Sequence, residues 1–215
     1  VWVGLFASDR WLKTVFTIFS LASMGVSLAA PSEEVSEEVD VVDGELAPLV
    51  AEPFVGDLSG IRDRGFLRVL VTHSRTDFFV NDGKILGIQA ELARELQKWL
   101  NKGIKREQDK LKLLFVPVTF DQLMPALEAG QGDVAAALLT ITPGRSKRVD
   151  FISGKRQAVA EVLVTHASTT APESIEALSG RSLTVLRGSS YVEHLRALNE
   201  QFAARGLEPI EVIEA

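Results

Sequence analysis

Two kinds of apolar pattern follow each other along residues 58–215. Short, continuous apolar runs predict strands at 67–72, 113–118 and 134–139, the last of them buried on both faces. Between these runs, apolar residues recur every four positions at Ile88, Leu92, Leu96 and Leu100, which predicts an amphipathic helix with one buried stripe. A second helix is expected over 122–129, capped by Asp121 and ended by Gly130. Strands and helices that alternate in this way predict an α/β fold with parallel strands.

The flanking segments predict further elements of the same kind. We expect a helical turn over 59–65 closed by Gly65, and a tight turn at 81–83. Pro117 places its strand near a sheet edge, because proline cannot donate to a strand ladder. The remaining elements expected are a strand over 159–165, a loop and short helix over 172–178, a strand over 180–186, a helix from Arg187 toward Asn199 and a strand over 210–213.

The first 29 residues have the pattern of an export signal. Arg10 and Lys13 precede an apolar run from Val15 to Leu28, and small residues at 27–29 offer a cleavage site after Ala29. The apolar run is shorter than the roughly 20 residues that span a bilayer. A cleaved signal peptide and an uncleaved membrane anchor both fit, and either one predicts a periplasmic location.

Charge separates the next segment from the folded part. Residues 1–57 carry ten acidic and two basic side chains, a net charge of −8, so residues 58–215 carry +2 of the total of −6. Residues 30–57 hold no basic side chain, and a segment of such composition cannot bury enough apolar surface to fold. We expect a disordered tether there. The rest has no large basic face, which argues against nucleic-acid binding.

Composition also excludes several kinds of chemistry. The chain has no cysteine, so disulfides and thiolate metal sites are excluded. His73, His166 and His194 share no metal-ligand spacing, and no phosphate loop, dinucleotide fingerprint or nucleophile elbow is present. We therefore expect no cofactor and no metal.

Three segments are candidates for ligand contacts because each follows a predicted strand. Thr140 and Thr142 place hydroxyls at the end of the strand over 134–139, and Arg145 next to them can grip a carboxylate through two parallel hydrogen bonds. The second segment is the turn before the helix that starts near Arg187, where free backbone N–H groups bind anions. The third follows the first strand. The residues selected from the second and third segments are Ser189, Ser190, Asp77, Phe78 and Phe79.

Residues 132–151 carry a motif of known type. Their Gly-Asp start, the run Thr-Ile-Thr-Pro-Gly-Arg at 140–145 and the Val-Asp-Phe end resemble the signature of the family 3 periplasmic solute-binding proteins, amino-acid-binding partners of ABC importers. The resemblance implies two lobes, 58–160 and an incomplete second lobe over 161–215, with 159–165 crossing between them. It implies that Thr140 and Arg145 face the cleft, with Arg145 on a ligand carboxylate. Leu138 stands where many amino-acid binders have glycine, and Gly144 where an acidic residue is common.

A narrower resemblance covers residues 57–215. The segments 57–72, 74–79, 178–180 and 189–191 are similar to the N-terminal module of the lytic murein transglycosylase F-like proteins, in which a lysozyme-like catalytic domain follows. It implies a non-enzymatic module that binds an amino acid or a murein fragment, and that regulates the attached domain or delivers solute to an ABC permease. Two alternatives stay open: a periplasmic dehydratase that uses His73 or Asp77 as its acid or base, and a degenerate lobe that binds nothing.

Overall fold

The computed structural model describes residues 51–152, here called the larger part, and residues 160–215, the smaller part. The predicted signal or anchor and most of the acidic tether lie outside the described residues. Within the described residues, no helix is long and apolar enough to cross a membrane. The helices are α3 (Leu58–Arg64), α4 (Ile88–Leu100), α5 (Leu123–Glu128) and α6 (Ser190–Ala204), and the strands are β1 (Phe66–Val71), β2 (Phe79–Asn81), β3 (Lys84–Leu86), β4 (Lys112–Pro117), β5 (Val134–Ala136), β6 (Ser182–Val185) and β7 (Glu211–Glu214).

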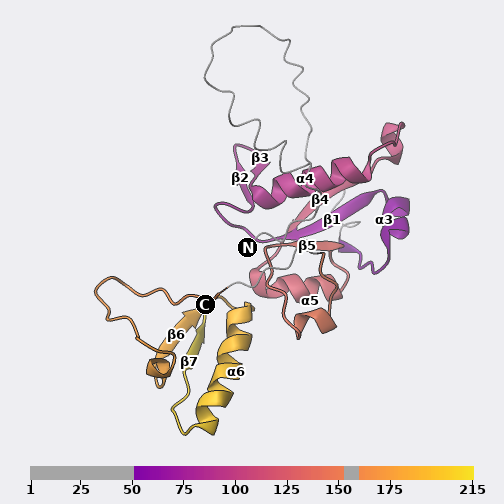
Figure 1. Cartoon of the computed structure of the whole chain (residues 1–215). Coiled ribbons are helices and arrows are strands. Elements are labelled where there is room, and N and C mark those ends of the chain that lie inside the picture. Colours follow the sequence, from indigo (N-terminus) through magenta and orange to yellow (C-terminus); the bar gives the residue numbers. More distant parts are fainter. Residues whose placement is uncertain (1–50, 153–159) are drawn as a thin grey trace, which may run out of the picture.

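The larger part is a parallel sheet of order β4-β1-β5 with α4 on one face and α5 on the other (Figure 1). Side chains of β1 alternate between the two layers because successive strand residues point to opposite faces. Val69 and Val71 belong to a core cluster with buried residues of α4, whereas Leu70 packs with residues of α5. Hydrophobic burial on both faces thus fixes the central strand. This confirms the predicted α/β class and the parallel pairing.

Most predicted elements occur close to the expected positions. β4 is an edge strand, as Pro117 predicts, and it ends at Pro117, one residue before the expected end. Helix α3 is closed by Gly65 in the left-handed conformation, and Asp82 and Gly83, both with positive φ, form the turn of the β2–β3 hairpin. Asp121 does not cap α5: it lies in a preceding 3₁₀ turn over Phe120–Gln122, and Gln122 takes the cap position.

Helix α4 has the predicted length but a different buried face. Ala90, Ala93 and Leu100 are buried, whereas Ile88 is exposed and Leu92 and Leu96 are half-buried. The expected stripe is wrong by part of a turn, because small alanines let the helix approach the sheet. The polar Gln89 is buried on this face as well.

Two predicted strands differ from the structure. The run over 134–139 forms a strand only at Val134–Ala136, whose side chains are half-buried rather than buried on both faces, because no strand of the described residues pairs with the outer edge of β5. Residues 160–165 form no strand, and Val162 and Val164 are about as exposed as side chains can be. A β-rich run needs a neighbouring strand to pair with, and these residues have none in the described chain. Val159 lies outside the described residues.

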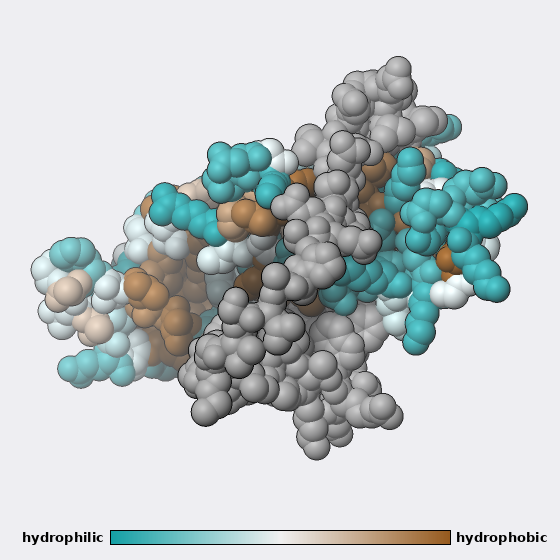
Figure 2. Space-filling view, turned by 90° about the horizontal axis from the view of Figure 1, so that it is seen from above, coloured by the Kyte–Doolittle hydropathy of each residue, from teal (hydrophilic) through white to brown (hydrophobic). Residues whose placement is uncertain are grey.

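The smaller part pairs β6 with β7 in parallel and covers them with α6. Phe202 and Val192 of α6 and Ile210 before β7 are buried there. Apolar side chains nevertheless remain on its surface; Figure 2 shows them at the end of the molecule that holds β6 and β7, whereas the end with α3 is mostly hydrophilic. The exposed apolar residues of this part include Val162, Val164, Ile175, Leu186, Tyr191 and Ile213.

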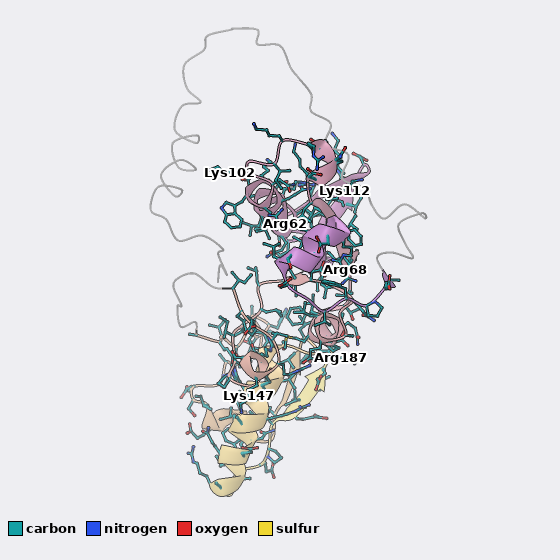
Figure 3. All side chains as sticks on the ribbon, turned by 90° about the vertical axis from the view of Figure 1, so that its right-hand side faces the viewer. Arg62, Arg68, Lys102, Lys112, Lys147 and Arg187 are labelled. Atoms are coloured by element: carbon teal, nitrogen blue, oxygen red, sulfur yellow. The ribbon has the colours of Figure 1, made fainter. Side chains whose placement is uncertain are left out.

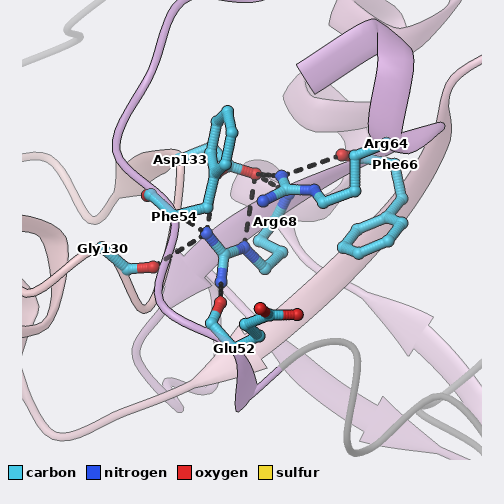
Figure 4. Close-up of polar contacts among 7 residues, drawn as sticks. All are labelled: Glu52, Phe54, Arg64, Phe66, Arg68, Gly130 and Asp133. Carbon is cyan, nitrogen blue, oxygen red and sulfur yellow. Dashed lines mark hydrogen bonds and ion pairs between the residues drawn. The ribbon is translucent and has the colours of Figure 1, made fainter. Parts of the chain in front are cut away.

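A buried charge network surrounds Arg68 of β1 (Figure 4). Arg68 pairs with Asp133 at 3.0 Å, and both side chains are essentially inaccessible. The Arg68 guanidinium also donates to the carbonyl oxygens of Glu52 and Gly130, at 2.9 and 2.8 Å. Phe54 stacks under the Arg64 guanidinium, 4.5 Å from its ring centre. Residues 52–54 of the predicted tether therefore contact the folded part, so ordered contacts begin before Leu58.

Candidate functional site

The candidate site begins at the C-terminal end of β5, where the chain leaves the sheet. Thr142 is buried, and its hydroxyl accepts a hydrogen bond from the backbone N–H of Arg145 at 3.2 Å. This local contact turns the chain into the short 3₁₀ helix Arg145–Lys147. The turn directs Arg145 back over the segment that follows β5, since its Nη1 donates to the carbonyl oxygen of Thr140 at 3.2 Å.

Arg145 also reaches the smaller part. Its Nη2 donates to the Gly188 carbonyl oxygen at 2.9 Å, and its Nε donates to Glu193 Oε1 at 3.0 Å. The side chain is only 4% exposed. All of these partners accept hydrogen bonds, which suits a guanidinium, because it has donors alone. Arg145 thus connects the end of β5 to the start of α6.

A protein carboxylate occupies the donors of this cluster. Glu193 extends from the first turns of α6, and its second oxygen accepts from the Thr142 hydroxyl at 2.9 Å. One carboxylate is therefore held by a guanidinium and a hydroxyl together, an arrangement that suits carboxylates in general. Unlike Arg145, Glu193 is open to water, with 42% of its side chain exposed. The three side chains that form this cluster, called here the carboxylate clamp, are Thr142, Arg145 and Glu193.

Gly188 lies against the larger part of the molecule. A Cβ on Gly188 would lie 2.6 Å from the Cα of Asp121, and its φ of +72° is one that side chains rarely adopt. Asp121 itself has a lowered pKa, chiefly because the Thr119 hydroxyl donates to it, with a smaller contribution from the charge of Arg187. In Figure 3, Lys147 and Arg187 lie close to the level at which the larger and smaller parts meet, away from Lys102 and Lys112.

The two serines of the second candidate segment adjoin this contact. Ser189 is the N-cap residue of α6 and Ser190 is its first residue, and both are buried. The Ser189 hydroxyl makes no hydrogen bond in the described part of the chain and does not cap the helix. A buried hydroxyl without a partner is unusual and calls for an explanation.

The third candidate segment, which follows β1, has contacts of its own. Phe78 is buried in the core against Phe115, with ring centres 5.1 Å apart, and Phe79 is half-buried at the start of β2. Asp77 accepts a hydrogen bond from the Ser74 hydroxyl at 3.2 Å, and His73 is exposed. Within residues 51–152 and 160–215, no hydrogen bond links these residues to Arg145 or to Gly188.

Two residues that matter here were not selected from the sequence. They are Gly188, in the turn before α6, and Glu193, within α6. Ser190 and Glu193 have the spacing of a helix capping box, so the sequence predicts a carboxylate that serves its own helix. The structure places that carboxylate on Arg145 instead.

An apolar groove runs along the outer edge of β5, between α4 and α5. Leu92, Leu96, Met124, Leu127 and Phe151 contribute to it, whereas the residues of the carboxylate clamp do not. No cluster of His, Asp or Glu suited to a metal ion occurs in the described residues.

The fold and the motif define a class of protein. Residues 67–205 match the bacterial extracellular solute-binding proteins, family 3. The chain belongs to this family, and its sheets have the α/β arrangement of periplasmic binding proteins, of which they match a part.

Among curated proteins, the chain is similar to the membrane-bound lytic murein transglycosylase F of Maricaulis maris, with 37% identity over 155 residues. The match covers 72% of this chain and 32% of that protein, and it lies in the N-terminal solute-binding-like region. The protein of the same name from Aeromonas salmonicida is 33% identical over 67% of this chain and 27% of its own length. The chain thus spans about a third of the length of these relatives or less.

Among solved structures, an ancestral arginine-binding protein bound to arginine is similar over 70% of this chain and 61% of its own, with 26% identity and a TM-score of 0.51. An ancestral amino acid-binding protein, described as a precursor of cyclohexadienyl dehydratase, is 28% identical with the same TM-score, over 74% of this chain and 64% of its own.

Proposed function

We propose that this chain is a periplasmic solute-sensing module that binds a small carboxylated ligand, an amino acid or a murein-derived fragment. One observation carries the proposal: Arg145, at the carboxyl end of a parallel strand, is buried and holds a carboxylate that comes from the smaller part of the molecule. A ligand carboxylate has the same chemistry as the one now held there. The similarity to amino-acid-binding proteins supports this ligand class.

In this proposal the donors have separate roles. Arg145 and Thr142 hold the ligand carboxylate, and Thr140 lies beside them at the strand end. At the N-terminus of α6, Ser190 offers its backbone N–H group and Ser189 its free hydroxyl, whereas the Ser189 N–H already donates to the Leu186 carbonyl oxygen. The domain division proposed above, with lobes at 58–160 and 161–215, places these two sets on different lobes, which a bound solute would hold together.

Phe78 and Asp77 receive less support as ligand contacts. Phe78 would have to leave the core to reach a solute, and Asp77 is bonded to its own loop. Phe79, which is half-buried, remains the better candidate for an apolar contact.

The biological role that we propose follows from the relatives. Because the chain matches the solute-binding-like region of transglycosylase F proteins, we infer that it regulates a murein-cleaving domain in response to a murein fragment or amino acid. Delivery of solute to an ABC permease is the second candidate, favoured by the family itself. Two experiments distinguish these roles. Co-purification of the chain with an ABC permease complex would support delivery, and stimulation of murein cleavage by the solute would support regulation.

Catalysis on this scaffold is less well supported. A dehydratase would need an acid or base that reaches the ligand, whereas Asp77 is hydrogen-bonded to Ser74 of its own loop and His73 is exposed. Turnover of prephenate-like substrates that is lost in Asp77→Asn would establish it.

The direct test is isothermal titration calorimetry of the chain with L-amino acids and murein peptides. We expect binding that is lost in Arg145→Met. Arg148→Met is the matched control, because Arg148 lies three residues away and forms a surface pair with Glu128. Binding that survives Arg145→Met would refute the assigned role of Arg145, and absence of heat with every ligand would favour a lobe that binds no solute.

A further inference from the structure

The carboxylate clamp is charge-balanced without a ligand. Arg145 contributes one positive charge and Glu193 one negative charge, and both oxygens of Glu193 are occupied, one by Arg145 and one by Thr142. A ligand carboxylate that binds Arg145 and Thr142 must therefore displace Glu193. The exposure of Glu193 shows that water already reaches it, whereas Arg145 is enclosed. Glu193 is therefore the member of the pair that a ligand can displace, and Arg145 is the member that stays in place.

Displacement leaves two carboxylates beside one guanidinium. Like charges a few ångströms apart repel, and a partly buried site does not tolerate an uncompensated charge. The excess negative charge is removed if the ligand carries its own cation next to its carboxylate. The freed Glu193 then has a partner within reach, since it stays attached to α6 beside the same donors.

We infer that Glu193 is a specificity-determining residue: it competes with a ligand's carboxylate for Arg145 and, once displaced, pairs with the ligand's α-ammonium group. The site therefore selects zwitterionic amino acids over simple carboxylic acids and N-acylated amino acids. This inference rests on the proposed function, because it assumes that Arg145 receives the ligand. The capping-box spacing of Ser190 and Glu193 would instead give Glu193 only the role of capping its own helix.

The inference predicts a change in preference as well as in affinity. Wild type should bind L-arginine about tenfold or more tightly than Nα-acetyl-L-arginine, which lacks the ammonium group, because hydrogen bonds between charged groups are the stronger kind. In Glu193→Gln the competitor and the ammonium partner are both lost. The preference should then fall to about twofold or less, with the acetylated ligand gaining the most.

The experiment is calorimetry of the full chain with these two ligands. Glu200→Gln is the matched control: it makes the same change on an exposed position of the same helix, and it should keep the wild-type preference. Glu193→Asp retains the charge with a shorter reach and should give an intermediate preference, so the test stands if Glu193→Gln folds poorly.

Three outcomes separate the two proposals. A preference that collapses only in the Glu193 variants supports the inference. An unchanged preference in Glu193→Gln, together with loss of binding in Arg145→Met, overturns the inference and leaves the proposed function intact. Failure of wild type and Glu193→Gln alike to bind these two ligands or any other L-amino acid or murein peptide overturns both.

Discussion

Among the residues that the structure describes, two arginines are almost fully buried, and both hold a carboxylate, but the carboxylates differ. Asp133, the partner of Arg68, is as inaccessible as the arginine itself. Glu193, the partner of Arg145, is nearly half exposed and belongs to the other part of the molecule. The first pair lies within one part and is shielded on all sides; the second lies where two parts meet and is open to exchange.

The difference teaches how burial of the partner decides what an ion pair can do. A pair with both members buried cannot open without leaving charge in a low-dielectric interior, so it acts as a fixed brace. A pair with one member in water can open at little cost, because the freed carboxylate becomes hydrated. Only the second kind can give way to a ligand.

The largest effect on stability is expected from removing the buried ion pair between Arg68 and Asp133. Asp133→Asn should lower the free energy of unfolding by about 3–5 kcal/mol, because the buried Arg68 charge loses its counter-ion. Urea denaturation measures this loss. Asp63→Asn, an exposed change on α3, is the control and should leave stability almost unchanged. A small loss in Asp133→Asn would show that water enters the network and that the contrast between the two pairs is wrong.

The contact between the two parts is the next target. Gly188→Ala should weaken ligand binding by about tenfold or more, because its methyl group would collide with Asp121 and its φ is strained, at about 1–2 kcal/mol for the backbone alone. Calorimetry with L-arginine measures the effect. Gly206→Ala also lies at positive φ, but nothing lies within 4 Å of its added Cβ. Equal losses of binding in both variants would show that backbone strain, and not the contact, is responsible.

The sequence predicts the larger part well, because its signals are local. Continuous apolar runs mark β1 and β4, Gly65 marks the end of α3, and Pro117 marks β4 as an edge strand. The strand expected over 159–165 was wrong, because a strand depends on a partner that lies far away in the sequence. The buried face of α4 was misjudged for a related reason: alanine spacing, not leucine spacing, decides how the helix meets the sheet.

For the candidate site, the sequence motif indicated Arg145 and the start of α6, and hydrogen bonds bring the two together. It could not indicate Glu193, whose partner lies 48 positions earlier. Leu138 shows a third limit. It stands at a position where related proteins often have glycine, and it adopts a φ of +51°, so the chain keeps the glycine-like backbone with a bulkier residue.

The open pair should contribute less to stability than the brace. Without ligand, Glu193→Gln should lower the free energy of unfolding by about 1 kcal/mol, because Arg145 keeps its bonds to two carbonyl oxygens and glutamine still accepts one hydrogen bond. Urea denaturation of this variant beside Asp133→Asn ranks the two pairs directly. A loss as large as that of Asp133→Asn would mean that Glu193 is a brace and not a displaceable partner.

A third arginine pair extends the comparison to the surface and should give the smallest effect. Arg148 holds Glu128 through two hydrogen bonds, at 2.6 and 2.7 Å, but both side chains are largely exposed. The hydrogen bond from Arg148 lowers the pKa of Glu128. A lowered folded-state pKa means that this pair stabilises the chain above the unfolded pKa of about 4.3, and that the contribution is lost as the pH falls through the folded value. Urea denaturation of Glu128→Gln should therefore show a slight loss at pH 7 that shrinks in high salt and disappears once the pH is below the lowered pKa of Glu128. A loss that persists at low pH or in salt would mean that geometry, and not the exposure of the partners, sets the strength of these pairs.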